Sequence, residues 1–367
     1  MNIYDELGVK QVINAHATLT RLGGSIMPPE VVAAMQDAAR WFIDLDELQA
    51  RAGAKLAELT RNEAAYISTG AAAGIVLAVA ACVTRGERDR IARLPDTSSM
   101  KNEALVFKSH RNGYDHAIRN VGLKIVEVGD GATCAPADLE AAIGDRSAVF
   151  VWFQGAMSGR GDLPLAQVID LCAARGVPVI VDAAAQLPPV ENLWRFTRMG
   201  AACAIFSGGK DLCGPQASGL VVGQKWLIEA MRPIGNPNAG IGRPMKVGKE
   251  EMAGLLAAVR RYLSLDHEAR CRRDEQVVAD WCQTLNRLAG VRAQRSFPNE
   301  AGQPLPRCEV ILEDGARLTR DALMQALMAG TPAISVAAAG ERGIFLNPMT
   351  LSDTEVDLVT ARLLQLL

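Results

Sequence analysis

Short apolar runs alternate with segments of helical periodicity along most of this chain, and that alternation limits its fold more than any other feature. The apolar runs have the length and composition of buried strands. The expected strands are residues 64–68, 104–108, 124–128, 148–153, 178–181, 202–207 and 219–222, and the expected helices between them are 71–83, 115–120, 136–143 and 165–175. Strands joined through helices pair in parallel and are covered on both faces. The sequence therefore predicts an α/β fold with a mostly parallel, seven-stranded sheet.

The flanking segments indicate further parts of the molecule. Pro28-Pro29 opens a helix whose apolar face extends to Phe42, and a second helix spans 45–59. A stretch rich in Gly, Pro and Asn at 235–242 marks a boundary, and one long helix at 249–287 follows it. The expected parts are an N-terminal arm at 1–27, a large cofactor-binding domain at 28–248, and a linker helix with a small C-terminal α/β domain at 249–367.

Charge and composition argue against several classes of function. The 39 Lys and Arg residues against 41 Asp and Glu give a formal net charge of −2, so no surface for nucleic acid is predicted. The longest apolar run, residues 71–83, is too short to span a bilayer, so no membrane partner is expected. The eight cysteines form no CxxC pair and there are four histidines, so no metal site is predicted. The polar N-terminus does not resemble a signal peptide, and the cysteines suit a reducing environment. A cytoplasmic location is therefore expected.

A stretch of small residues, Ser68-Thr69-Gly70-Ala71-Ala72-Ala73-Gly74, lies where a strand is expected to pass into a helix. Small side chains let backbone N–H groups approach an anion, and a helix N-terminus adds a favourable partial charge. Thr69 supplies a hydroxyl as well. The same residues also suit an ordinary strand–helix turn, so this stretch alone leaves both interpretations open.

Asp182 and Lys210 each follow an apolar strand, at the end where open α/β sheets bind ligands. A carboxylate at that end suits a cation such as a protonated pyridine nitrogen, although an N-cap for the next helix is an alternative. Lys210 comes after Ser207-Gly208-Gly209, where the glycines leave space for a planar ring. Partial burial favours imine formation between a lysine and an aldehyde, and a lysine in a surface turn is the alternative.

The order of these three pieces is more specific than any one of them. One flat cofactor could use all three pieces. The anion site would bind its phosphate, the acid would pair with its ring nitrogen, and the lysine would react with its aldehyde. Pyridoxal 5'-phosphate (PLP) carries these three groups, and the sequence therefore predicts a PLP enzyme.

The chain also resembles the aminotransferase-like PLP enzymes of fold type I, in the branch of bacterial L-seryl-tRNA(Sec) selenium transferases and D-glucosaminate-6-phosphate ammonia-lyases. The segment around Lys210 is the most specific part of this resemblance. The matching stretches are Val12-Ile13-Asn14-Ala15, Val126-Glu127-Val128-Gly129, Pro178–Asp182, Phe206-Ser207-Gly208-Gly209-Lys210, Gly214-Pro215-Gln216-Ala217 and the segment 242–250.

The resemblance implies a role for each candidate residue. Lys210 is expected to bind PLP as a Schiff base, Asp182 to pair with the pyridinium nitrogen, and His110 to stack on the ring. The expected phosphate ligands are Thr69, Gly70, Ala71 and Ser207, and Gln154 is expected to face the cofactor's 3-oxygen or the substrate. The candidates for substrate contacts across a dimer interface are Asn14, His16 and Arg21. The candidates for binding a substrate carboxylate are Arg243 and Arg342.

The implied reaction begins at Cα of an amino acid or amino-sugar acid. An α,β-elimination, giving a 2-oxo acid and ammonia, is the first hypothesis. A racemase or epimerase would need a second acid such as His110 or Cys213, and an aminotransferase would need a second substrate. A non-enzymatic scaffold is disfavoured, because it would not need both Lys210 and Asp182. The resemblance further implies a homodimer or a larger homo-oligomer.

Overall fold

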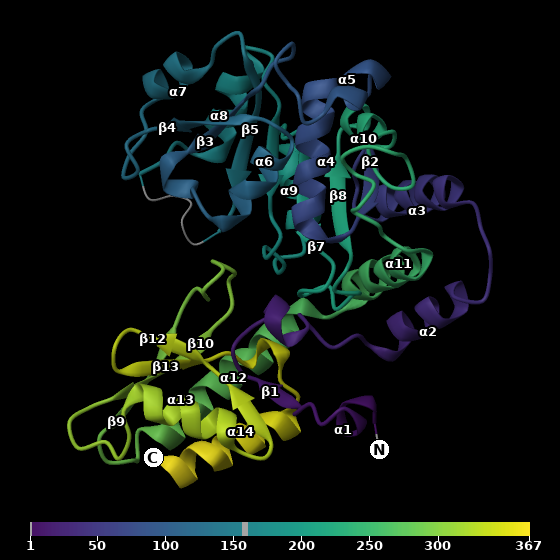
Figure 1. The fold of residues 1–367 in the computed structure, drawn as a ribbon. Coiled ribbons are helices and arrows are strands. Elements are labelled where there is room, and N and C mark those ends of the chain that lie inside the picture. Colours follow the sequence, from purple (N-terminus) through teal and green to yellow (C-terminus); the bar gives the residue numbers. More distant parts are fainter. Residues whose placement is uncertain (1, 156–160) are drawn as a thin grey trace. The chain divides into compact units, whose positions relative to one another are not determined.

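The computed structural model describes residues 2–155 and 161–367, which form two compact units (Figure 1). The larger unit is Met27–Leu265, and the smaller one combines Met1–Ile26 with Asp266–Leu367. This division differs from the expected one, because residues 249–265 belong to the larger unit and the N-terminal arm belongs to the smaller. No helix in the described ranges is long and apolar enough to cross a membrane.

A seven-stranded sheet forms the centre of the larger unit, as predicted. Its strands lie in the order β2-β8-β7-β6-β5-β3-β4, and β8 alone runs antiparallel to its neighbours. The strands are β2 (Ala64–Ser68), β3 (Glu103–Phe107), β4 (Lys124–Val128), β5 (Ser147–Phe153), β6 (Val179–Asp182), β7 (Cys203–Ser207) and β8 (Gly219–Gly223).

Helices cover both faces of this sheet, because its strands are apolar on both sides. In β5, Phe150 and Trp152 enter one hydrophobic core, whereas Val149, Val151 and Phe153 enter the other. The first core includes α3 (Leu45–Leu59), α7 (Pro136–Ala142), α8 (Leu165–Ala173), α9 (Asn192–Arg198) and α11 (Lys249–Ser264); the second includes α4 (Gly70–Thr84), α5 (Arg88–Arg93), α6 (His116–Asn120) and α10 (Lys225–Met231).

Two helices near the domain boundaries differ from the prediction. The helix α2 (Pro29–Ala38) ends before Phe42, whose side chain is 105% exposed instead of lying on the apolar face. The single helix expected over 249–287 is two helices, α11 and α12 (His267–Leu285). Leu265 is extended, and the carboxylate of Asp266 accepts a hydrogen bond from the backbone N–H of Ala269 at 2.8 Å, which caps the second helix.

The smaller unit is an α/β domain with its own hydrophobic core. Its antiparallel sheet has the order β12-β13-β10-β9, and β1 pairs in parallel with β11 in a separate ladder. The elements are α1 (Ile3–Glu6), β1 (Val12–Asn14), α12, β9 (Val291–Ser296), β10 (Arg307–Leu312), α13 (Arg320–Ala329), β11 (Ala333–Ser335), β12 (Ala337–Ala339), β13 (Gly343–Leu346) and α14 (Asp353–Leu366).

Candidate active site

The carboxyl ends of β2, β3, β5, β6 and β7 lie at one edge of the large sheet, where β8 begins. Asp182 is the last residue of β6 and lies opposite Phe153 of β5 and Ile205 of β7. Gln154 directly follows β5, and Ser207 ends β7. The pairing of the strands therefore brings three of the predicted site residues to neighbouring positions at the edge where ligands bind in open α/β sheets.

The carboxylate of Asp182 is buried, with the residue 9% exposed. Among the described residues, its side chain accepts one hydrogen bond, from the backbone N–H of Ala184 to Oδ1 at 3.0 Å. Burial raises the pKa of Asp182, whereas that hydrogen bond and the positive charge of Lys210 lower it. Lys210 follows β7, the strand that pairs with β6, so both residues belong to the same edge of the sheet. A buried carboxylate of this kind suits a cationic group of a ligand.

Lys210 lies in a tightly packed turn between β7 and β8. The backbone N–H of Gly208 donates to the carbonyl of Ser218 at 2.8 Å, which folds the turn back onto β8. A Cβ on Gly209 would lie 2.5 Å from Cα of Gln216, so no larger residue fits there. Because the turn is packed on the chain around it, half-buried Lys210 is held at the edge of the sheet instead of on a projecting loop.

The start of α4 lies beside these residues. Ser68 and Ser207 both pair with Gly219, so the ends of β2 and β7 flank the first residue of β8. Helix α4 begins at Gly70, whose φ is +79°, with Thr69 as its N-cap. Among the described residues, and apart from the backbone of its own helix and its chain neighbours, no atom lies within 4 Å of the position of a Cβ on Gly70. The first N–H groups of a helix have no partner within the helix. This open space at a positive helix end fits a phosphate group.

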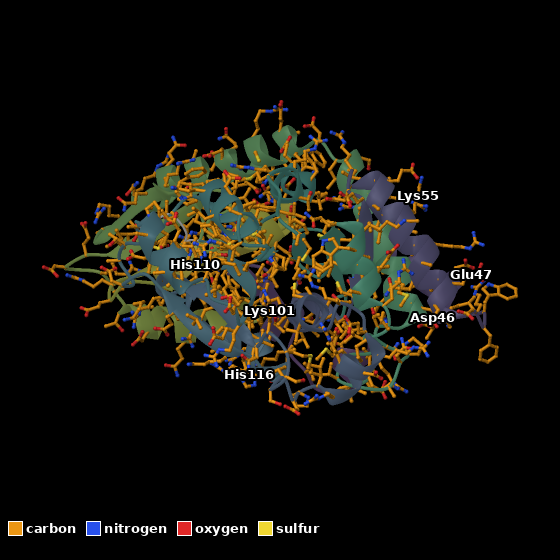
Figure 2. The ribbon with its side chains drawn as sticks, turned by 90° about the horizontal axis from the view of Figure 1, so that it is seen from above. Asp46, Glu47, Lys55, Lys101, His110 and His116 are labelled. Carbon is orange, nitrogen blue, oxygen red and sulfur yellow. The ribbon has the colours of Figure 1, made fainter. Side chains whose placement is uncertain are left out.

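His110 follows β3 and is completely buried (Figure 2). Its ring contacts the rings of Trp152 and Phe107 edge-on, with centroids 4.7 and 5.3 Å away. Its Nε2 lies 3.4 Å from the carboxylate of Asp162, which also accepts a hydrogen bond from the hydroxyl of Ser109 at 2.7 Å. Burial lowers the pKa of His110, and Asp162 opposes that effect. Because the imidazole is enclosed, stacking on a cofactor ring requires these side chains to rearrange.

Gln154 is oriented by its neighbours. Its Oε1 accepts a hydrogen bond from Nε1 of Trp152 at 2.8 Å, and its backbone N–H donates to the carbonyl of Asp182 at 2.9 Å. The side chain of Gln186, which is buried, donates to the carbonyl of Gln154 at 3.3 Å. Sequence reasoning identified neither Gln186 nor Asp162, because their partners are distant along the chain.

The three candidates from the N-terminal arm belong to the smaller unit. The side chain of Asn14 forms a local turn: its Oδ1 accepts from the backbone N–H groups of His16 and Ala17, and its Nδ2 donates to the carbonyl of Ala17. His16 is half-buried; burial lowers its pKa, and Glu300 opposes that effect. Arg21 is exposed. The amide of Asn14 is therefore already used in stabilising the arm.

The two arginine candidates for a substrate carboxylate are both exposed. Arg243, in the larger unit, donates to Oδ1 of Asn236 at 3.2 Å. Arg342, in the smaller unit, pairs with Asp314 at 2.7 Å. The pairing of the strands brings neither of them to the edge that carries Asp182. Within the part of the chain that the structure describes, no group of three or more His, Cys, Asp or Glu side chains is arranged to hold a metal ion.

The profile of the L-seryl-tRNA selenium transferase family matches residues 12–289. D-glucosaminate-6-phosphate ammonia lyase of Salmonella typhimurium is 33% identical over 370 residues, which cover 99% of this chain and 97% of that protein. A 5'-C-glycyluridine monooxygenase-decarboxylase of a Streptomyces species is 36% identical over 340 residues, covering 90% and 83% of the two chains.

Solved structures agree with these sequence comparisons. A structure of D-glucosaminate-6-phosphate ammonia-lyase matches with a TM-score of 0.87 and 32% identity, covering 100% of this chain and 98% of the other. The ureidoglycine-glyoxylate aminotransferase of Bacillus subtilis matches with a TM-score of 0.61 at 17% identity, covering 93% and 90%, which confirms the aminotransferase-like fold. Because the family profile matches most of the chain and the structure has the predicted fold, this chain belongs to the L-seryl-tRNA selenium transferase family.

Proposed function

We propose that this chain is a PLP-dependent lyase, which removes a proton from Cα and a leaving group from Cβ of an amino acid or a 2-amino-sugar acid and releases a 2-oxo acid and ammonia. One observation carries the proposal: the buried Asp182 ends β6, and the turn that contains Lys210 follows the neighbouring strand β7 at the same edge of the sheet. The 33% identity to an ammonia lyase over the full chain supports elimination as the reaction type.

The residues at this edge fit the chemical groups of PLP. The open space at the start of α4 suits the phosphate, the carboxylate of Asp182 suits the protonated ring nitrogen, and Nζ of Lys210 is the proposed partner of the aldehyde carbon. The ring would supply an electron sink for the charge that develops at Cα. The proposed phosphate ligands are Thr69, Gly70, Ala71 and Ser207, with Gln154 toward the 3-oxygen.

Among the residues of this chain, Lys210 and Asp182 would have the main catalytic roles. With cofactor and substrate bound, Nζ of Lys210 would act as the base that accepts the proton from Cα. The same ammonium can then donate a proton to the departing hydroxyl. The carboxylate of Asp182 would hold a proton on the ring nitrogen through its negative charge. The stacking role of His110 stays a prediction, since its ring is enclosed by Phe107 and Trp152.

A small-molecule substrate is proposed in place of tRNA. The near balance of 39 basic and 41 acidic residues offers no excess positive charge for a phosphate backbone. We further propose a cytoplasmic homodimer or larger homo-oligomer. The exposed apolar residues Trp41 and Phe42 support self-association, and the cysteines of the described residues, which form no disulfide, support a reducing compartment.

An experiment with defined substrates tests this function. The purified protein is mixed with PLP, its visible absorbance is recorded, and borohydride trapping is followed by peptide mapping around residue 210. Serine-like, threonine-like and 2-amino-sugar-acid substrates are then assayed for ammonia and 2-oxo acid. Release of both products supports the lyase, whereas an uncoloured protein with no trapped peptide overturns the proposal.

The same assay separates the alternatives. Loss of optical rotation without ammonia indicates a racemase or epimerase, and turnover only with an added 2-oxo acid indicates an aminotransferase. The 36% identity to a monooxygenase-decarboxylase favours one further candidate, an oxidative decarboxylation. Oxygen uptake and carbon dioxide release identify that reaction, and their absence in the presence of ammonia excludes it.

A further inference from the structure

Two cysteine thiols face each other inside the smaller unit. Sγ of Cys282, on α12, lies 3.8 Å from Sγ of Cys308, on β10. A disulfide requires the two sulfur atoms to be about 2.05 Å apart. The thiols are already in contact, so a disulfide requires only that the two sulfur atoms approach each other further.

The two thiols differ in their surroundings. Cys308 is fully buried in the hydrophobic core of the smaller unit, next to residues such as Val310 and Leu346. Cys282 is half-buried at the margin of that core. A hydrogen bond with the thiol of Cys308 lowers the pKa of Cys282, and the same contact together with burial raises the pKa of Cys308. Cys282 is therefore the thiol that a small oxidant reaches, and it is the better nucleophile.

We propose that Cys282 and Cys308 form a reversible disulfide when the protein meets a peroxide. The thiolate of Cys282 attacks one oxygen of hydrogen peroxide, hydroxide leaves, and Cys282 becomes a sulfenic acid. The sulfur of Cys308 then attacks the sulfur of Cys282 and the sulfenic oxygen leaves as water. In total, two thiols and one hydrogen peroxide give one disulfide and two molecules of water, and a thiol reductant restores the pair.

The bond would tie α12 directly to β10 and close the chain between residues 282 and 308 into a loop. A cross-link of this kind stabilises a fold mainly by restricting the unfolded chain. Oxidation is therefore expected to make the smaller unit harder to unfold. This inference does not depend on the proposed lyase activity, because neither cysteine belongs to the edge that carries Lys210 and Asp182.

A second pair of neighbouring cysteines, in the larger unit, differs from Cys282 and Cys308 in its burial. Cys82 and Cys203 interact electrostatically in the core of the larger unit. Both are almost completely buried, and burial raises the pKa of each thiol. An oxidant in solution reaches neither of them, whereas the pair in the smaller unit combines contact between sulfur atoms with access from outside.

The test uses the full-length protein, reduced and freed of reductant. It is treated with hydrogen peroxide, denatured with an alkylating reagent, and analysed by intact mass and by peptide mapping without reduction. We expect the wild type to lose two alkylatable thiols, to yield one peptide pair linking 282 to 308, and to regain both thiols with dithiothreitol. Its unfolding midpoint in denaturant is expected to rise on oxidation.

Variants provide the controls. Cys271→Ala removes another half-buried thiol of the same helix and is expected to behave like the wild type. Cys282→Ala, at the margin of the core, is expected to abolish both the linked peptide and the oxidation-dependent rise in the midpoint. If Cys308→Ala does not fold, Cys282→Ala alone decides the matter. Peroxide that leaves the pair reduced, or that carries Cys282 to the sulfinic acid without a link to Cys308, overturns the proposal.

Discussion

At the scale of single residues, the proposed chemistry depends most on the amine of Lys210. We expect Lys210→Ala to remove the PLP-dependent visible absorbance and the borohydride-trapped peptide. Loss of a general acid and base is worth about 10²–10⁴-fold in rate, so elimination falls by at least that factor. The control is Lys225→Ala, because Lys225 is exposed and pairs with Glu229 on α10. Retained colour in the alanine variant, with trapping at another lysine, would contradict the assignment.

The buried carboxylate of Asp182 gives a prediction with two parts. Because burial raises its pKa in the folded protein, Asp182 contributes stability only at low pH, and this contribution is lost as the pH rises through the folded pKa. Asp182→Asn is therefore expected to stabilise the protein without PLP near neutral pH, as measured by denaturant unfolding.

The same variant is expected to bind PLP more weakly. Removing one partner of a buried charge pair costs about 2–5 kcal/mol, which a titration of PLP absorbance measures. Asp170→Asn, on the exposed side of α8, serves as the control for both measurements and is expected to match the wild type. An Asp182→Asn protein that is less stable and binds PLP with unchanged affinity would refute this role.

His110 is expected to make the stability of the protein depend on pH. Its burial holds its pKa below the ordinary value of about 6.5, so the unfolded chain binds a proton more readily than the folded one. Stability is therefore lost as the pH falls from about 6.5 through the folded pKa. In denaturant unfolding, His110→Phe is expected to lose less stability than the wild type over that range. His116→Gln, at an exposed histidine, should retain the wild-type slope, and equal slopes in all three proteins would exclude this effect.

The sequence predicts Asp182 and Lys210 as site residues because one ends and the other follows a recognisable apolar strand, and parallel strands of one sheet end at a shared edge. It did not identify Asp162, because its contacts with Ser109 and His110 join segments that only the fold brings together. The enclosure of His110 also escaped prediction, since burial of a loop histidine depends on neighbours such as Trp152 from another strand.

At the scale of elements, the close approach of β8 to α4 shapes the proposed phosphate site. A Cβ on Gly219 would lie 2.5 Å from the carbonyl carbon of Gly70 and 2.6 Å from Oγ of Ser68. Gly219→Ala is therefore expected to displace the start of α4. Overpacking of this kind costs about 1–3 kcal/mol, and PLP affinity is expected to fall as well. Thermal unfolding and PLP titration measure the two effects.

Gly144→Ala is the matched control for this glycine. In the part of the chain that the structure describes, no atom beyond the two chain neighbours lies within 4 Å of a Cβ at position 144, so the substitution is expected to change neither stability nor PLP affinity. If Gly219→Ala behaves like Gly144→Ala, the contact between β8 and α4 does not position the phosphate site.

The elements that the sequence predicted well are those that are buried. Strands such as β5 and helices such as α4 are apolar over nearly their whole length, so composition and length define them. The short helices α9 and α10 lack a side-chain hydrogen bond at the N-cap. Because no typical cap residue precedes them, the sequence does not predict where they begin. The break between α11 and α12 contains neither Gly nor Pro; it depends on the capping carboxylate of Asp266.

At the scale of the whole molecule, the chain builds two units with separate hydrophobic cores. The sequence placed a boundary at 249 because Gly and Pro precede it, yet the chain divides after Leu265. Helix α11 remains in the larger unit because Met252, Leu255 and Val259 are buried in its core. Which core an amphipathic helix joins depends on tertiary contacts, and periodicity alone does not specify them.

Exposed apolar residues in the loop between α2 and α3 lead to a prediction about assembly. Trp41, Phe42 and Ile43 are 65%, 105% and 45% exposed, an arrangement that a second chain would be expected to cover. Removing an interface hot spot costs about 2 kcal/mol or more, which corresponds to roughly 30-fold in the dissociation constant. Phe42→Asp is therefore expected to shift the proposed homo-oligomer toward monomer in sedimentation velocity. Leu358→Asp, at one of the two exposed leucines of α14, is the control. A wild type that sediments as a monomer, or a Phe42→Asp protein that assembles as tightly as the control, would rule out this loop as the site of association.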